Sequence, residues 1–157
     1  MHRIVLFGNS GSGKSTMARA IASQYGIPHL DLDSLAWATP GVRKPVGECT
    51  AEIRAFVGAN PRWVIEGCYG DLLEVAIASA TEIRFLNPGV EACIANCRAR
   101  PWEPEKYPSP EAQDAMLDFL IGWVRDYETR TDEYSLVRHR QLYEAFVGRK
   151  SEVTTRG

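Results

Sequence analysis

Short apolar runs alternate along the chain with longer stretches in which apolar residues recur at helical spacing. The short runs are rich in β-branched and aromatic residues and end at glycine, aspartate or asparagine, which is typical of buried strands. The longer stretches repeat apolar residues every three or four positions, which predicts helices. Strands are predicted at 3–7, 29–31, 63–66, 81–86 and 150–154, and helices at 14–25, 50–59, 71–80, 90–100, 111–127 and 134–146, with a helix or turn at 33–37.

This alternation predicts an α/β fold in which helices cover both faces of a parallel sheet. Two segments interrupt it. Residues 39–47 contain two prolines, two glycines and two basic residues, which is the composition of a loop. Residues 101–110 contain four prolines together with Trp102 and Tyr107. Because disordered linkers seldom contain large aromatic residues, we expect an ordered excursion there. The 157 residues are expected to form one domain, with a lid at about 98–112.

The composition is that of an ordinary globular protein, with 45% hydrophobic and 24% charged residues. A formal net charge of −2 argues against a large nucleic-acid footprint. No apolar run approaches the roughly 18 residues that span a bilayer. The apolar N-terminal run leads directly into a glycine-rich loop and lacks the features of a signal peptide. We therefore expect a cytoplasmic protein without a membrane partner, either a monomer or a homodimer.

Two of the four cysteines, Cys93 and Cys97, are four positions apart and would share one face of a helix. A metal or redox pair is one interpretation, and two small buried thiols are the other. The chain has no Cys-x-x-Cys, and its three histidines show no ligand spacing. The pattern favours buried thiols.

A phosphate-binding motif, Gly-x4-Gly-Lys-Ser, follows the first predicted strand. Glycines let successive backbone N–H groups converge on phosphate oxygens, and a helix that begins there directs its N-terminus at the same anion. The lysine would neutralise the β and γ phosphates, and the serine hydroxyl would bind Mg²⁺. A glycine-rich turn without function is the alternative, but the strand before and the helix after argue against it. The sequence predicts an ATP site formed by Gly8, Asn9, Ser10, Gly11, Ser12, Gly13, Lys14, Ser15 and Thr16.

Carboxylates follow two of the predicted strands. Asp31 and Asp33 come after the second strand, and Glu66 ends the third. Ligands of parallel sheets bind at the carboxyl ends of strands. We therefore expect Ser15, Asp31 and Glu66 to form the Mg²⁺ site, and Asp33 to orient the hydroxyl that accepts the phosphate. Helix capping by Asp33 and a hydrogen bond from Glu66 to the phosphate loop are the alternatives.

The sequence resembles the small P-loop kinases of the adenylate kinase and shikimate kinase type, and in particular the topology-modulation-protein-like, adenylate-kinase-related group. The likeness rests on the loop at 8–16, the segment at 29–37 and the segment at 63–69, and it weakens after about residue 110. It implies a five-stranded parallel sheet in the order 2-3-1-4-5 and an ATP-dependent phosphotransferase. The same resemblance favours ATP, and no guanine-reading Asn-Lys-x-Asp string is present.

The resemblance also implies a lid whose arginines close over the phosphates, because guanidinium groups bind phosphate in a bidentate manner. Arg98 and Arg100 match the lid edge and are the expected catalytic arginines, together with Lys14 and Asp33. Arg125 and Arg130 are further candidates. A solvated helix face is the alternative for each arginine.

The sequence departs from these families where the acceptor would bind. Nucleoside monophosphate kinases usually carry Gly-Phe-Pro-Arg after the third strand, and shikimate kinases a glycine triplet, whereas this chain has Gly-Cys-Tyr-Gly at 67–70. The small-molecule acceptor therefore stays unidentified. Trp37 would either stack on a ring of the acceptor or belong to the core. A kinase is favoured over two alternatives, a nucleotide-dependent regulatory or DNA-associated ATPase and a non-catalytic binding module, because no water-positioning residue or switch loop is evident.

Overall fold

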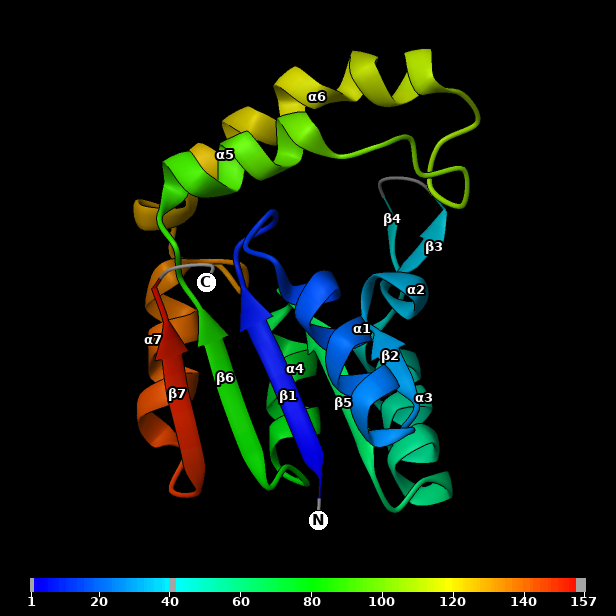
Figure 1. Cartoon of the computed structure of the whole chain (residues 1–157), viewed down its shortest axis with the longest axis vertical. Helices are drawn as coiled ribbons and strands as arrows, with labels where there is room; N and C mark the ends of the chain where they lie inside the picture. The colour runs from blue at the N-terminus through cyan, green and yellow to red at the C-terminus, as the bar shows by residue number, and fades with distance from the viewer. Residues whose placement is uncertain (1, 40–41, 155–157) are drawn as a thin grey trace.

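A parallel sheet organises the described residues, 2–39 and 42–154, of the computed structural model (Figure 1). Within them the sheet has five strands in the spatial order β2 (His29–Asp31), β5 (Trp63–Gly67), β1 (Arg3–Gly8), β6 (Glu82–Leu86) and β7 (Arg149–Val153). Numbered along the chain, this order is 2-3-1-4-5, which confirms the predicted sheet. All four pairings are parallel. β1 therefore lies in the centre, which explains its uninterrupted apolar run.

Alternate residues of β1 pack against helices on opposite faces of the sheet. Ile4 and Leu6 contact α1 (Lys14–Tyr25) in one buried cluster. Val5 and Phe7 belong to a second cluster, which includes residues of the helices on the other face. Side chains of a strand alternate between faces, so a single apolar strand supplies both layers of the core. The second face is covered by α3 (Val46–Ala59), α4 (Gly70–Ile77) and α7 (Leu136–Ala145).

Two helices cross the carboxyl ends of the strands. α5 (Val90–Ala99) and α6 (Pro110–Arg125) pack side by side above the tips of β1 and β6 (Figure 1). They share a third buried cluster that includes Ile94 and Val124. Ser109 begins α6 by accepting a hydrogen bond from the Ala112 N–H at 3.1 Å, with proline next in the chain. The 3₁₀ helix η1 (Asp126–Glu128) follows.

The predicted loop at 39–47 was wrong in part. The chain forms the short helix α2 (Asp33–Ala36) and then an antiparallel hairpin of β3 (Trp37–Thr39) and β4 (Val42–Arg43). Pro40 and Gly41 lie outside the described residues. α3 begins at Val46, directly after a proline and four residues before the predicted start at 50. A hairpin arises from pairing between segments, which composition does not encode.

The other element boundaries fall within a few residues of those predicted. No helix in the part of the chain that the structure describes is long and apolar enough to cross a membrane.

Candidate active site

The glycine-rich loop between β1 and α1 is pressed against α5. Gly11 and Gly13 have φ angles of 80° and 96°, a region that favours glycine. A Cβ atom on Gly11 would lie 2.4 Å from the carbonyl oxygen of Cys93, so no larger residue fits. Asn96 of α5 donates a hydrogen bond of 2.7 Å to the Gly11 carbonyl. The helix above the sheet therefore holds the loop in its strained shape.

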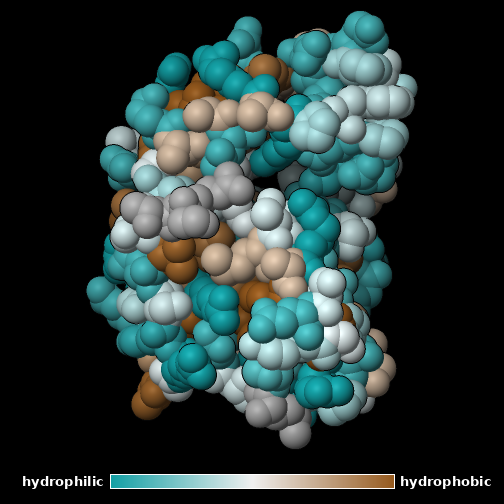
Figure 2. Space-filling view, viewed as in Figure 1, coloured by the Kyte–Doolittle hydropathy of each residue, from teal (hydrophilic) through white to brown (hydrophobic). Residues whose placement is uncertain are grey.

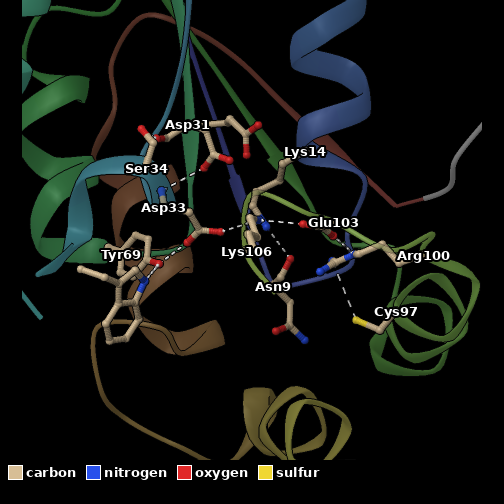
Figure 3. A network of polar contacts seen from close by, with 12 residues as sticks. Asn9, Lys14, Asp31, Asp33, Ser34, Tyr69, Cys97, Arg100, Glu103 and Lys106 are labelled. Carbon is tan, nitrogen blue, oxygen red and sulfur yellow. Dashed lines mark hydrogen bonds and ion pairs between the residues drawn. The ribbon is translucent and has the colours of Figure 1, made fainter. Parts of the chain in front are cut away.

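The first residues of the loop form a polar network of their own. Asn9 is 3% exposed and donates to the carbonyl oxygen of Val124 at 3.2 Å. The Lys14 ammonium turns back and donates to the Asn9 carbonyl oxygen at 2.7 Å (Figure 3). The Ser12 hydroxyl is buried and has no hydrogen-bond partner among the described residues. An orphaned hydroxyl and a lysine that bonds only its own loop are groups that a phosphate would satisfy.

Oxygen donors that suit Mg²⁺ gather at the same edge of the sheet. Asp31 and Glu66 occupy paired positions of β2 and β5, and Ser15 lies in the first turn of α1. Glu66 is 2% exposed, and His29 lies at 2.9 Å from its carboxylate. Its hydrogen bond thus goes to a neighbouring strand and not to the phosphate loop. Mg²⁺ is commonly bound by one or two carboxylates plus substrate phosphates, so this donor set fits the ion.

The charge state of Asp31 reflects this crowding. Burial raises the pKa of Asp31 to about 6, and the charges of Glu66 and Asp33 act in the same direction. Across residues 2–39 and 42–154, no group of three or more His, Cys, Asp or Glu side chains is arranged to hold a metal by itself. Any Mg²⁺ at this edge would therefore need phosphate oxygens and water as further ligands.

Asp33 lies at the centre of a network that joins three elements (Figure 3). Its carboxylate accepts a hydrogen bond from the Tyr69 hydroxyl at Oδ1, and the ammonium of Lys106 lies 3.3 Å from Oδ2. Its own N–H donates to the Asp31 carboxylate at 2.9 Å. The Asp31 carboxylate thus accepts the N–H of the first residue of α2, while the Asp33 carboxylate contacts partners from other elements and does not cap the helix.

The protonation states in this network are well defined. Burial alone would raise the pKa of Asp33, but Lys106, the Tyr69 hydroxyl and Lys14 outweigh it and hold this pKa below its usual value. Burial, with the charges of Cys68 and Asp33, raises the pKa of the Tyr69 phenol far above its usual value. Asp33 is therefore an ionised acceptor at neutral pH, and Tyr69 is a fixed donor.

An aromatic group with one arginine lies beside Asp33. Trp37 donates from Nε1 to the Tyr69 hydroxyl at 3.0 Å, and its ring is 40% exposed, so it does not belong to the core. Arg43 from β4 lies over the Tyr69 ring, 4.8 Å from its centroid. The same guanidinium donates to the Tyr134 hydroxyl at 2.5 Å and pairs with Asp71 at 3.5 Å. The hairpin missed by the sequence prediction thus supplies Trp37 and Arg43, which contact Tyr69.

The segment between α5 and α6 reaches the site through a chain of ion pairs. Arg100 lies 3.6 Å from the carboxylate of Glu103, and the other oxygen of Glu103 lies 3.3 Å from Lys106. Trp102 donates to the Tyr107 carbonyl at 3.0 Å, which gives the segment an ordered shape.

The space-filling view shows a narrow hollow between the α5–α6 layer and the sheet below it (Figure 2).

The structure distributes the predicted site residues unevenly. Asp31, Asp33 and Arg100 lie in one chain of contacts that runs through Lys106 and Glu103, and the charge of Lys14 acts on Asp33 (Figure 3). Arg98 is on the exposed face of α5. The further candidates lie elsewhere. Arg125 is exposed on α6, and Arg130 stacks on the Trp123 ring at 4.3 Å. Cys93 and Cys97 are free, buried thiols against the phosphate loop, which matches the buried-thiol interpretation.

Sequence reasoning missed Lys106, Tyr69 and Arg43 as site residues. Tyr69 follows the glycine that ends β5, so its position at the carboxyl edge of the sheet was available as a signal. The contact of Lys106 with Asp33 spans 73 positions. Nothing in a proline-rich segment marks such a partner.

Comparison with known proteins supports the fold and the loop. The family described as "ATPase family associated with various cellular activities (AAA)" matches residues 4–62. An adenylate kinase of Methylobacterium nodulans is 32% identical over 97 residues, which cover 62% of this chain and 47% of that protein. An adenylate kinase of Nitrobacter winogradskyi is 29% identical over 156 residues, which cover 99% of this chain and 65% of that protein. The chain spans less than two thirds of the length of either relative.

A solved structure shares the fold. The gluconokinase of Sinorhizobium meliloti 1021 has a TM-score of 0.54 and 18% sequence identity, with 99% of this chain and 84% of that chain covered. At this identity the likeness concerns the fold alone. The sheet order, the phosphate loop and these likenesses agree with the resemblance found in the sequence: the chain has the fold of the small P-loop kinases and is similar to adenylate kinases.

Proposed function

We propose that the chain is an ATP-dependent phosphotransferase that moves the γ-phosphate of ATP to a small molecule held beside Asp33. One observation carries the proposal. The Asp33 carboxylate is held by Tyr69 and Lys106. It lies close enough to Lys14 of the phosphate loop for the charge of Lys14 to lower the pKa of Asp33. Phosphoryl transfer needs positioning, charge neutralisation and a group that orients the acceptor, and the network contains a residue for each of these.

The phosphate loop binds the anion in this proposal. Its N–H groups and the N-terminus of α1 contact phosphate oxygens, and Lys14 exchanges the Asn9 carbonyl for the β and γ phosphates. Ser15, Asp31 and Glu66 would hold Mg²⁺ and its waters. When bound, the ion would neutralise charge on the β and γ oxygens. Asp33 orients the acceptor hydroxyl and takes its proton.

The segment at about 98–112 acts as a lid on a single P-loop domain. Glu103 links Arg100 to Lys106, so three charged side chains of the lid lie in one chain of contacts that ends on Asp33. Arg98 and Arg100 supply positive charge to the phosphates when the lid closes over ATP. Arg98 is exposed, so its part in this proposal needs a rotation of its side chain.

A regulatory or DNA-associated ATPase is the second candidate. The match to the AAA family favours it, but that match ends at residue 62, before β5 and before the lid. It therefore covers the phosphate loop and Asp33 and leaves out Tyr69 and Lys106. A switch also needs a residue that orients attacking water. The network around Asp33 would orient a bound acceptor as well as a water molecule, so it does not favour the switch over the transferase. The transferase is the better supported candidate.

The test is ADP release with panels of nucleosides, nucleoside monophosphates, sugars and sugar acids. We expect at least one acceptor to raise ADP release above the rate with ATP alone. Lys14→Ala should abolish the increase through lost ATP binding, and Asp33→Asn should lower it about 100-fold or more with ATP binding intact. Release that stays at the background rate with every acceptor contradicts the proposal and favours the ATPase.

A further inference from the structure

We propose that the acceptor presents a neutral hydroxyl to Asp33, and not the phosphate of a nucleoside monophosphate. This inference rests on the proposed function and names the class of its second substrate. It follows from the polarity of the hydrogen bonds at Asp33, from the contacts that already engage Arg43 beside it and from the local excess of carboxylates.

Both carboxylate oxygens of Asp33 face donors. Oδ1 accepts from the Tyr69 hydroxyl, whose oxygen in turn accepts from Trp37 Nε1 at 3.0 Å. The indole N–H can only donate, so the phenol proton is directed at Asp33. Oδ2 faces the Lys106 ammonium at 3.3 Å. This second contact is partly exposed, since the side chains of Lys106 and Asp33 are 37% and 41% accessible. It is therefore the position at which a substrate can take over.

A hydroxyl group can replace the ammonium at Oδ2, because its O–H donates as the N–H did. A phosphate monoester near neutral pH is mainly a dianion, and its oxygens only accept. Placed against Asp33, such a phosphate would set acceptor against acceptor and charge against like charge. The carboxylate thus favours a donor and disfavours an anion through like-charge repulsion.

A phosphate acceptor would also need guanidinium groups, which bind it in a bidentate manner. Arg43, which lies over the Tyr69 ring beside Asp33, is already engaged by Tyr134 and Asp71.

Asp31 and Glu66 occupy paired positions of β2 and β5, and the Asp33 N–H donates to the Asp31 carboxylate at 2.9 Å, so three carboxylate side chains gather at one edge. ATP already brings its own negative charge to this edge. The ATP phosphates, with any Mg²⁺ that Asp31 and Glu66 would hold, already occupy this edge, so a second anion beside Asp33 would add a like charge to it.

The hydroxyl oxygen forms a bond to the γ-phosphorus while the bond between the γ-phosphorus and the bridging oxygen of ADP breaks. The hydroxyl proton passes to Asp33 Oδ2 and then to water. ADP leaves with the electron pair of the broken bond, and the product is a phosphate ester of the acceptor.

The first test compares two panels with the intact chain, ATP and Mg²⁺. One holds the nucleoside monophosphates, and the other holds phosphate-free nucleosides, sugars, polyols and sugar acids. We expect transfer of γ-labelled phosphate to a member of the second panel and background transfer with the first. Transfer to a monophosphate overturns the inference and leaves the proposed function standing. Transfer to neither panel overturns the proposed function and the inference with it.

The second test measures AMP affinity by calorimetry while a non-hydrolysable ATP analogue and Mg²⁺ fill the ATP site. Removing the charge in Asp33→Asn should tighten AMP binding about tenfold or more, because a like charge a few ångströms away is lost. Asp114→Asn is the matched control on the exposed face of α6 and should leave AMP affinity unchanged. An Asp33→Asn affinity equal to or weaker than that of the wild type overturns the inference. Thermal unfolding of both variants shows that the comparison is between folded proteins.

Discussion

The ammonium of Lys106 lies 3.3 Å from the Asp33 carboxylate, which joins the segment between α5 and α6 to the first turn of α2. Both side chains are more than one third accessible to solvent, so the pair adds little to the free energy of unfolding. The pair matters because of the residues that it brings together. It brings a cation of the lid to the residue that we assign to the acceptor, and it closes a chain of contacts that begins at Arg100.

Lys106→Met should change the titration of Asp33 more than it changes stability. Lys106 is the strongest of the influences that hold the pKa of Asp33 down, so its loss raises that pKa. The acidic limb of the activity profile should shift to higher pH, while the free energy of unfolding changes by less than about 1 kcal/mol. Carboxyl ¹³C titration by NMR measures the shift directly. An unchanged titration would show that the ion pair does not form in solution.

Gly11→Ala should weaken nucleotide binding. The new Cβ would lie 2.4 Å from the Cys93 carbonyl oxygen, and the φ angle of 80° disfavours alanine. We expect a loss of about 2 kcal/mol or more in stability together with weakened ATP binding, by denaturant unfolding and calorimetry. Gly122→Ala in α6 is the control, because nothing lies within 4 Å of its added Cβ. It should stabilise the protein by up to about 1 kcal/mol. Equal effects of the two substitutions would contradict the proposed packing of the loop on α5.

Stability should fall between neutral pH and pH 4 because of one buried histidine. His139 is fully buried, with Nε2 donating to the Cys68 carbonyl at 2.8 Å and Nδ1 at 2.6 Å from the Tyr127 hydroxyl. Burial lowers its pKa to about 4, and the charges of Lys14 and Arg138 act in the same direction. The unfolded chain takes up this proton near pH 6.5, whereas the folded protein resists it until about pH 4.

His139 therefore stabilises the fold fully above pH 6.5, and this contribution, about 3 kcal/mol, is lost as the pH falls toward 4. Urea unfolding at pH 7 and pH 4.5 measures it. His139→Gln should show a smaller drop between the two pH values than the wild type. Drops of equal size would mean that His139 is already protonated in the folded protein, or that other groups dominate.

Tyr69→Phe should weaken transfer without removing ATP binding. The substitution takes a donor from Asp33 and leaves Trp37 Nε1 without its acceptor. We expect the pKa of Asp33 to rise, and the rate of transfer to fall about tenfold, while calorimetry finds the ATP affinity of the wild type. Tyr143→Phe, in the core cluster and away from Asp33, is the control. A Tyr69→Phe protein with full transfer activity would remove Tyr69 from the site.

The sheet and the phosphate loop could be predicted from the sequence because each depends on short, continuous stretches of the chain. The apolar run before Gly8 is a buried strand, and the motif that follows it fixes its own geometry through glycine, lysine and a helix N-terminus. Asp31 and Glu66 were predictable for a related reason. Both end strands of a parallel sheet, and such ends meet at one edge.

The rest depends on contacts between distant segments. The segment at 39–47 was predicted as a loop because of its proline and glycine content, and the pairing of two strands as short as β3 and β4 leaves no period in the sequence. The pairing of Lys106 with Asp33 requires the path of α5 and α6 over the sheet, which no local pattern gives. Trp37 was ambiguous because an aromatic residue in a short element fits a core or a site equally well. Its 40% exposure and its bond to Tyr69 decide the matter.

The most direct test of the central claim follows the γ-phosphate of labelled ATP in single turnovers with the hydroxyl panel. The account predicts label in a small-molecule phosphate ester, at a rate that falls about 100-fold or more in Asp33→Asn while the affinity for ATP stays the same. Lys14→Ala should lose ATP binding itself. Label that appears only as inorganic phosphate, at equal rates in the wild type and in Asp33→Asn, would contradict the account.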